Sequence, residues 1–159
     1  MADFTIRAAS LDDQDTIVEY NQRLADETEG KTLDQATLGR GVAAALANPD
    51  RLRYWVAESD SKIIGQAAVT REWSDWRNGY IWWFQSVYVH ADFRGAGIFR
   101  ALHAAIRTAA KADPEVIGLR LYVEVHNDRA QRVYKSLGMK PGGYDVYEEL
   151  WITPVEPLL

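Results

Sequence analysis

Short apolar stretches with the repeat of a strand alternate along the chain with stretches that have the repeat of a helix. Runs rich in β-branched and aromatic residues predict strands, the longest and most apolar at Tyr80–Val89. A polar turn at Ser59–Ser61 separates two of the strands. The predicted strands cover residues 4–8, 54–57, 63–70, 80–89, 117–125 and a final hairpin-like segment at 144–152.

Four stretches have helical periodicity and recognisable ends. The first runs from an N-cap at Ser10 to about Glu27, and Gly30 breaks it. The second ends at Asn48-Pro49, where proline cannot continue the hydrogen-bond ladder. The helices are predicted at about 10–27, 33–47, 95–112 and 127–137, the last with Gly138 as its C-cap.

This order of elements predicts an α/β domain with a central, mostly antiparallel mixed sheet and helices on both faces. The chain has no repeat, long linker or low-complexity tract, so residues 1–159 are predicted to form a single domain.

A glycine turn follows the most apolar strand. The strand ends at Val89, and Gly95 and Gly97 open a helix whose apolar stripe begins at Ile98. Such a turn presents backbone N–H groups at the positive end of a helix dipole, which suits a pyrophosphate. A Rossmann site would need a third glycine where Arg100 stands, and the Gly-Lys-Ser/Thr of a Walker loop is absent. An isolated Gly-x-Gly would more often be only a helix start.

The segment Arg94-Gly95-Ala96-Gly97-Ile98 resembles the Arg/Gln-x-x-Gly-x-Gly/Ala signature of the GCN5-related N-acetyltransferases (GNAT). Phe99 departs from the signature, whose last position is normally glycine or alanine. A second block, Asn127 to Gly138, resembles the family's Asn-x-x-Ala-x-x-x-Tyr-x-x-x-Gly pattern at matching spacing. On its residues alone, this block is an amphipathic helix capped by Asn127 with Tyr134 in its apolar stripe.

The resemblance implies an acetyl-CoA-dependent N-acetyltransferase in which the fourth and fifth strands splay apart and the pantetheine arm lies between them. Val87, Tyr88 and Val89 are then expected along that arm, bound through the main chain of Val87 and Val89. Asn127 is expected to contact the arm or its neighbourhood. The diphosphate is expected on the amides of Arg94, Gly95, Ala96, Gly97, Ile98 and Phe99.

The same resemblance implies direct attack by an amine on the thioester, with Tyr134 protonating or hydrogen-bonding the departing thiolate. An alkyl ammonium with a pKa near 10 must first lose a proton. Many relatives use a glutamate on the fourth strand, but the matching position here is Gln85, which can only orient a water. Glu124 is the first candidate base, with an ion pair to Arg120 or another basic residue as its equally weighted structural alternative, and Glu72 is a further candidate.

The composition of the chain limits the classes of ligand and partner that we expect. The chain has no cysteine, and its formal net charge of −5 argues against a nucleic-acid ligand. Its start lacks a secretion signal and no apolar run reaches the roughly 18 residues of a membrane span, so we expect a cytoplasmic protein. The expected acceptor is a small-molecule or peptide amine, and exposed aromatic residues favour a homodimer.

Histidine spacing predicts no metal site at His90, His103 or His126, and His103 is expected at the surface. Trp82 and Trp83 should point to opposite faces of their strand, one into the core and the other toward the acceptor groove. Trp73 and Trp76 are expected on a loop, where they would form either an acceptor wall or a hydrophobic contact.

A second function remains open from the sequence. Because Gln85 and Phe99 depart from the family pattern, the chain could be a CoA-binding regulatory module that kept the fold and lost the chemistry.

Overall fold

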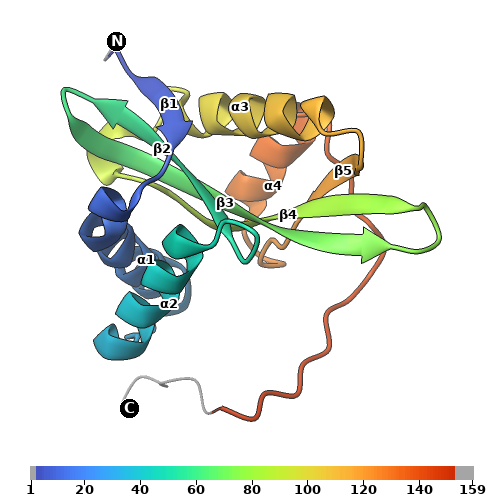
Figure 1. Ribbon diagram of the computed structural model, residues 1–159, viewed down its shortest axis with the longest axis horizontal. Coiled ribbons are helices and arrows are strands. Elements are labelled where there is room, and N and C mark those ends of the chain that lie inside the picture. The colour runs from blue at the N-terminus through green and yellow to red at the C-terminus, as the bar shows by residue number, and fades with distance from the viewer. Residues whose placement is uncertain (1–2, 153–159) are drawn as a thin grey trace.

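A five-stranded mixed sheet forms the centre of the computed structural model, which describes residues 3–152 (Figure 1). The strands follow the chain order β1-β2-β3-β4-β5 across the sheet. β1 to β4 pair antiparallel, and β5 pairs parallel to β4. The mixed, mostly antiparallel sheet predicted from the sequence is therefore confirmed. The strands span Thr5–Ala8, Arg53–Ser59, Lys62–Ser74, Gly79–Val89 and Val116–Leu121.

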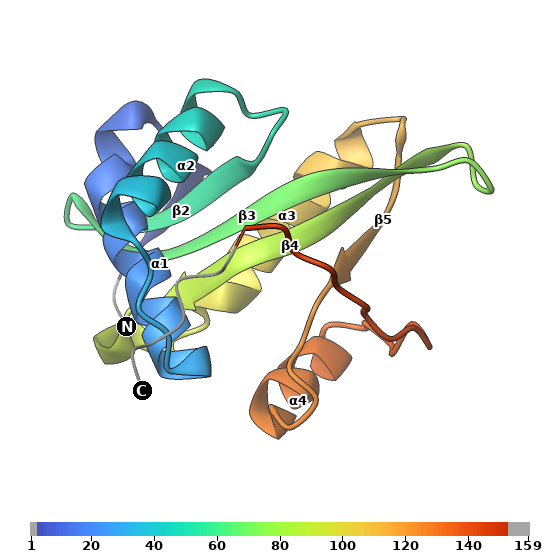
Figure 2. The same cartoon turned by 90° about the horizontal axis from the view of Figure 1, so that it is seen from below.

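Helices cover both faces of this sheet. The α-helices are α1 (Gln14–Glu29), α2 (Gln35–Ala47), α3 (Ile98–Ala112) and α4 (Asp128–Ser136). α1 and α2 lie together on one face, whereas α3 crosses the other (Figure 1). α4 follows β5 and lies to the side of the sheet, next to the start of α3 (Figure 2).

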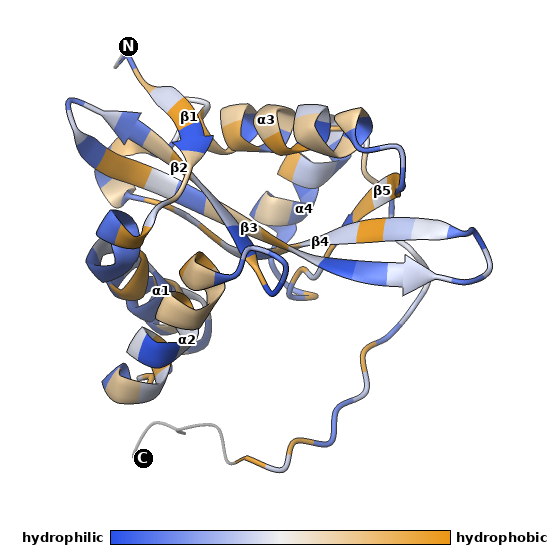
Figure 3. Cartoon of the chain, in the orientation of Figure 1, coloured by the Kyte–Doolittle hydropathy of each residue, from blue (hydrophilic) through white to orange (hydrophobic). Residues whose placement is uncertain are grey.

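Two hydrophobic cores fix these layers. Under α3, the fully buried side chains of Ile98, Leu102 and Ile106 pack against the sheet. This confirms that the helix is anchored just beyond the glycine turn. On the opposite face, Ile17 of α1 and Val42 of α2 pack on the inner strands. In Figure 3 hydrophobic colour follows parts of the central strands, while the tip of the β3–β4 hairpin is hydrophilic.

Local signals in the sequence explain the helix ends. Gly30 ends α1 with a φ of 62°, a left-handed conformation that suits glycine. Asp34 caps α2 by accepting a hydrogen bond from the Thr37 amide at 2.8 Å. These features hold α1 and α2 as an antiparallel pair over the sheet.

Three predictions about the elements are wrong. β3 continues to Ser74, so Trp73 lies in a strand and not in a loop. β5 ends at Leu121 rather than at 125. Residues 144–152 form no strand; their side chains are exposed, Tyr147 by 94% and Trp151 by 90%. The final strand expected at the edge of the sheet is therefore not formed.

The prediction that His103 lies at the surface is also wrong. It is buried in α3 instead of exposed, and its ring stacks on that of Phe84 with 5.6 Å between centroids. Burial, together with the charges of Arg107 and Arg100, lowers the pKa of His103. The residue is therefore a neutral core histidine at pH 7.

Candidate active site

The two parallel strands, β4 and the edge strand β5, separate about midway along β4. Pairing between β4 and β5 ends at Phe84 and Leu121, although β4 continues to Val89 (Figure 2). In the part of the chain that the structure describes, residues 85–89 therefore have no strand on their β5 side. The unpaired edge of this stretch can bind an extended ligand, and Val87 and Val89 both lie on it. The Ser86 and Val89 carbonyls already accept hydrogen bonds from the side chains of Gln66 and Arg94.

A β-bulge deforms β4 at the same place. Gln66 pairs with Tyr88, but Ala68 pairs with Gln85, so β4 has one extra residue. Ser86 takes a φ of 50°, which is unusual for a residue with a side chain. The bulge changes the direction of the main chain just where β4 loses its partner.

A buried side chain holds this bulge. The Nε2 atom of Gln66, a fully buried residue of β3, donates to the Ser86 carbonyl at 3.0 Å and to Oδ1 of Asn21 at 2.9 Å. Asn21 in turn donates to the Tyr54 hydroxyl at 3.1 Å. Sequence reasoning missed Gln66 and Asn21. The available signal was a glutamine in the middle of an otherwise apolar strand, because buried polar groups need partners.

The glycine turn lies beyond the end of β4. Gly95 and Gly97 have φ values of 82° and 80°, and Gly97 is the N-cap of α3. A Cβ atom added at either glycine would meet nothing within 4 Å, so the space beside the turn is open. Hydrogen bonds within the turn use the amides of Arg94 and Ala96. The turn fits a diphosphate, since the first amides of α3 lack acceptors in their own helix.

The side chain of Arg94 connects this turn to α1. Its guanidinium donates to Glu27 at 2.6 Å and to the Val89 carbonyl at 3.0 Å. Tyr88 is buried against α1, where its hydroxyl donates to Glu27 at 3.0 Å. Burial opposes ionisation of Glu27, but the hydrogen bonds from Arg94 and Tyr88 lower its pKa. The Tyr88 side chain thus faces α1, which leaves only its main chain for the predicted donor site.

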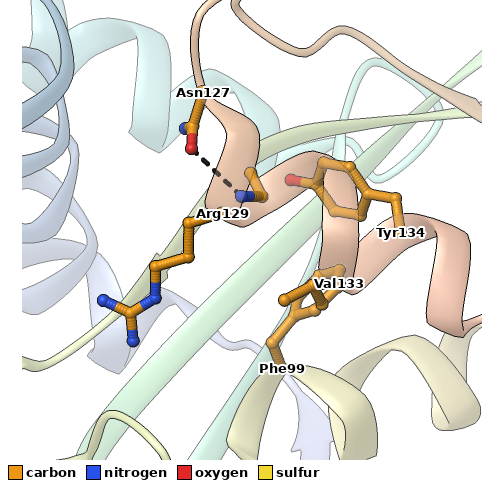
Figure 4. A pocket seen from close by; sticks show the side chains of 6 residues that line it. Phe99, Asn127, Arg129, Val133 and Tyr134 are labelled. Atoms are coloured by element: carbon orange, nitrogen blue, oxygen red, sulfur yellow. Dashed lines mark hydrogen bonds between the residues drawn. The ribbon is translucent and has the colours of Figure 1, made fainter.

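Phe99 and Tyr134 meet in a cavity between α3 and α4. Their rings contact edge to face with 5.7 Å between centroids. The cavity has a volume of about 250 Å³ and is also lined by Asn127, Arg129 and Val133 (Figure 4). Phe99 therefore finds room against α4, away from the main chain of the turn. The departure from glycine or alanine at this position is accommodated.

Tyr134 retains its proton at neutral pH. Burial raises the pKa of Tyr134 above its ordinary value of 10. Its hydroxyl points back along α4 toward the Asn127 end of the helix (Figure 4). A neutral phenol so placed can donate a proton or a hydrogen bond but cannot act as a base.

Asn127 and Glu124 shape the turn that leads into α4. Asn127 Oδ1 accepts from the Ala130 amide at 3.0 Å, which confirms the predicted helix cap. The Glu124 carboxylate accepts from the His126 amide at 2.8 Å and is exposed. Because β5 has already ended at Leu121, Glu124 does not lie on the strand that was predicted to reach residue 125. Arg120 pairs with Glu72, so the ion pair between Glu124 and Arg120 is not formed.

Glu72 contacts Trp83 and Arg120 on the face of the sheet opposite α3. It accepts from Trp83 Nε1 at 2.8 Å and from Arg120 at 3.2 Å. Trp83 also packs on Tyr122 with 4.4 Å between ring centroids. On the other face, Trp82 is buried beside Trp55, so the prediction of opposite faces is confirmed.

Trp73 and Trp76 of the β3–β4 hairpin do not lie near the glycine turn. Trp73 contacts Tyr80 near the start of β4, and Trp76 lies at the hairpin tip with 85% of its surface exposed (Figure 1). From Gly79 to Ser86, seven strand steps correspond to roughly 24 Å. Both tryptophans are therefore at the far end of the sheet from the glycine turn.

Comparison with known proteins identifies the family to which the bulge, the glycine turn and α4 belong. The sequence matches the profile of the Acetyltransferase (GNAT) family over residues 13–139, which include the bulge, the glycine turn and α4. The chain belongs to the GNAT acetyltransferase family. Among curated proteins, none matches the chain.

Several solved GNAT-fold structures are similar to the chain. A possible acetyltransferase from Clostridium difficile 630 is 43% identical, with a TM-score of 0.87 over 94% of this chain and 99% of that one. A predicted acetyltransferase from Clostridium acetobutylicum, solved with acetyl-CoA, is 24% identical, with a TM-score of 0.78 over 92% and 96%. Glucosamine-6-phosphate N-acetyltransferase from Arabidopsis thaliana is 20% identical, with a TM-score of 0.72 over 92% and 98%. The last two support the fold alone.

Residues 3–152 contain neither a metal-binding cluster nor a membrane-spanning helix. Within residues 3–152, no group of three or more His, Asp or Glu side chains is arranged to hold a metal ion. None of the helices among these residues is long and apolar enough to cross a membrane.

Proposed function

We propose that the chain is an acetyl-CoA-dependent N-acetyltransferase acting on a primary amine of a small molecule or peptide. The observation that carries the proposal is the glycine turn. Gly95 and Gly97 adopt left-handed conformations with open space beside them, at the start of a helix and beyond the unpaired end of β4. A diphosphate needs such a group of amide donors, and an extended arm needs such a strand edge.

Each part of the donor site has a separate task. Main-chain groups of Val87, Tyr88 and Val89 bind the pantetheine arm as an added strand would be bound. Among the predicted amides, those of Gly95, Gly97, Ile98 and Phe99 hold the diphosphate, because the amides of Arg94 and Ala96 are used within the turn. The Arg94 side chain contributes positive charge beside it. Asn127 contacts the arm from the opposite side, at the start of α4.

Acetyl-CoA supplies an acetyl group on a thioester, which a neutral amine can attack. The amine nitrogen forms a bond to the carbonyl carbon and loses one proton to solvent, and the carbon–sulfur bond breaks. Tyr134 then gives its proton to the departing sulfur and recovers one from solvent. The burial that raises its pKa keeps this proton in place until the sulfur becomes basic.

The amine must lose its own proton before it attacks. Gln85 can orient a water, while Glu124 and Glu72 remain the candidate carboxylates. Glu124 is exposed and bound to the His126 amide, and Glu72 is held by Trp83 and Arg120. Neither carboxylate is free of competing donors, which favours solvent as the proton acceptor.

Calorimetric titration with acetyl-CoA tests the donor site. Wild-type protein should bind in the micromolar range, and Gly97→Glu should abolish binding because it adds an opposing charge at the diphosphate. Gly143→Glu is the matched control, since Gly143 also has a left-handed φ, of 79°, and nothing within 4 Å of an added Cβ. No binding by a folded wild-type protein would refute the proposal.

Turnover separates the two functions that the sequence left open. Release of free thiol from acetyl-CoA in the presence of an amine would support an enzyme. Binding of acetyl-CoA without turnover for any amine would favour the regulatory module.

A further inference from the structure

A second, larger cavity lies between α1, α2 and the bulge of β4. Its volume is about 530 Å³, within the usual range of roughly 300–1,000 Å³ for small-molecule sites. Ser86 is part of its wall, so the cavity reaches the stretch of β4 proposed to hold the pantetheine arm. Six of the thirteen lining residues have apolar side chains: Leu24, Ala25, Leu33, Leu38, Val42 and Leu52.

The charged groups of this cavity and several of its polar groups are already engaged. Glu29 and Lys31, its two charged residues, pair with each other at 2.9 Å. Asn21 donates to the Tyr54 hydroxyl at 3.1 Å. The lining therefore offers no uncompensated charge to a second charged group on a ligand. A polyamine, or a sugar that carries a phosphate, would lose solvation there without gaining a partner.

We propose that this cavity binds the acetyl acceptor, and that the acceptor is a monoamine carried on an uncharged, apolar body. The inference rests on the proposed function. The apolar body lies against the leucines of α1 and α2, and the nitrogen lies toward Ser86. That orientation brings the nitrogen to the strand along which the thioester is bound.

The apolar lining also favours the neutral form of the acceptor amine over its ammonium form. Transfer of an ammonium into an apolar site disfavours its charged form and lowers its pKa, by as much as 3–5 units for full burial. The titratable groups that face the cavity are Glu29, Lys31 and Tyr54, and the one carboxylate among them is occupied by Lys31. The ammonium therefore gives its proton to solvent on entry, and the neutral amine attacks the thioester. No dedicated carboxylate base is required.

Binding of amines to the wild-type protein saturated with CoA tests the class of acceptor. Calorimetry would compare 2-phenylethylamine with spermidine and with glucosamine 6-phosphate. We expect 2-phenylethylamine to bind at least tenfold more tightly than either. Its apparent affinity should rise about tenfold per pH unit from pH 7 toward the pKa of the free amine near 10, because the neutral form binds. Tighter binding of spermidine or the sugar phosphate, or a flat pH dependence, would overturn the inference.

Two glycines of α2 provide a matched pair of variants. Gly41 lines the cavity, and Gly39 does not belong to its lining. A Cβ atom added at either position meets nothing within 4 Å, and neither glycine has a positive φ. Gly41→Phe should reduce the affinity for 2-phenylethylamine at least tenfold by filling the cavity, whereas Gly39→Phe should change it less than twofold. Both variants should keep wild-type affinity for CoA.

The outcomes distinguish the two proposals. If the wild-type protein does not bind CoA, the proposed function and the acceptor inference both fail. If it binds CoA but Gly41→Phe binds 2-phenylethylamine as tightly as wild type, only the acceptor inference fails. Loss of amine binding in Gly41→Phe alone, with CoA binding intact, supports both.

Discussion

Replacing Gln66 by methionine removes the amide that holds the β4 bulge while keeping a side chain of similar length and volume. In the wild-type protein Nε2 of Gln66 serves two acceptors, the part-buried Ser86 carbonyl and the buried Oδ1 atom of Asn21. Within the described residues its Oε1 atom is buried without a partner. Gln66→Met therefore leaves the Ser86 carbonyl and Asn21 Oδ1 without this donor. It also removes Gln66 Oε1, which has no partner in the wild-type protein among the described residues.

The expected loss of stability follows from the net number of acceptors that become unsatisfied. An unsatisfied buried acceptor costs about 1–3 kcal/mol, so the net effect is one acceptor's worth, about 1–3 kcal/mol. For a chain of this size each kcal/mol shifts Tm by about 2–4 °C, which predicts a decrease of roughly 2–12 °C. Ser86, with a φ of 50°, is then free to relax toward regular strand geometry.

Relaxation of the bulge should also weaken donor binding. It turns the main chain of Val87, so acetyl-CoA affinity should fall by about tenfold, the equivalent of one hydrogen bond. Calorimetric unfolding and titration with acetyl-CoA measure the two effects on the same preparation. Gln85→Met is the control, because the Gln85 amide is half-exposed and reaches only Thr70 Oγ1 at 3.4 Å. That variant should stay within about 0.5 kcal/mol of wild type.

Two results would contradict this account. Wild-type stability in Gln66→Met would show that the hydrogen bonds to Ser86 and Asn21 contribute nothing. Lower stability with unchanged acetyl-CoA affinity would show that Gln66 supports the fold but does not shape the donor site.

Three further predictions concern other parts of the molecule. Tyr134→Phe should lower kcat by about 10–100-fold in a thiol-release assay while leaving acetyl-CoA affinity unchanged, and unchanged kcat would exclude Tyr134 as the acid. Gly65→Ala should destabilise the protein by about 1–3 kcal/mol in denaturant titration, because its Cβ would lie 2.8 Å from Ile98, whereas Gly118→Ala, with nothing within 4 Å, should not. The lowered pKa of His103 means that the unfolded chain binds the extra proton more readily, so stability should fall as pH drops below about 6.5; His103→Phe should reduce this dependence, and an identical pH profile would refute it.

The sequence predicted those parts of the fold that depend on local chemistry. Gly30 and Gly138 end helices because they can adopt left-handed φ values of 62° and 86°. The turn at Gly95 and Gly97 was identified for the same reason, since two glycines before an apolar helix leave few structural alternatives. Each of these signals lies within a few residues of the feature that it determines.

Features that depend on distant contacts were not predicted. The stacking of His103 on Phe84 follows from how α3 crosses the sheet, and spacing along α3 alone does not reveal it. Residues 71–74 lack clear alternation because the hairpin extends beyond the helices that cover the sheet, so they were taken for a loop. The clamp of Gln66 on the bulge joins two strands and α1, and only the folded chain brings them together.

α1 contributes to both proposed sites from different sides. Leu24 and Ala25 line the acceptor cavity, while Glu27, two residues later, binds the guanidinium of Arg94 at the glycine turn. A diphosphate arriving at that turn would compete with the Glu27 carboxylate for one cation. Binding at the donor site would therefore change the position of α1 in the wall of the acceptor cavity. For the proposed activity, this predicts ordered addition in which the acetyl donor binds first.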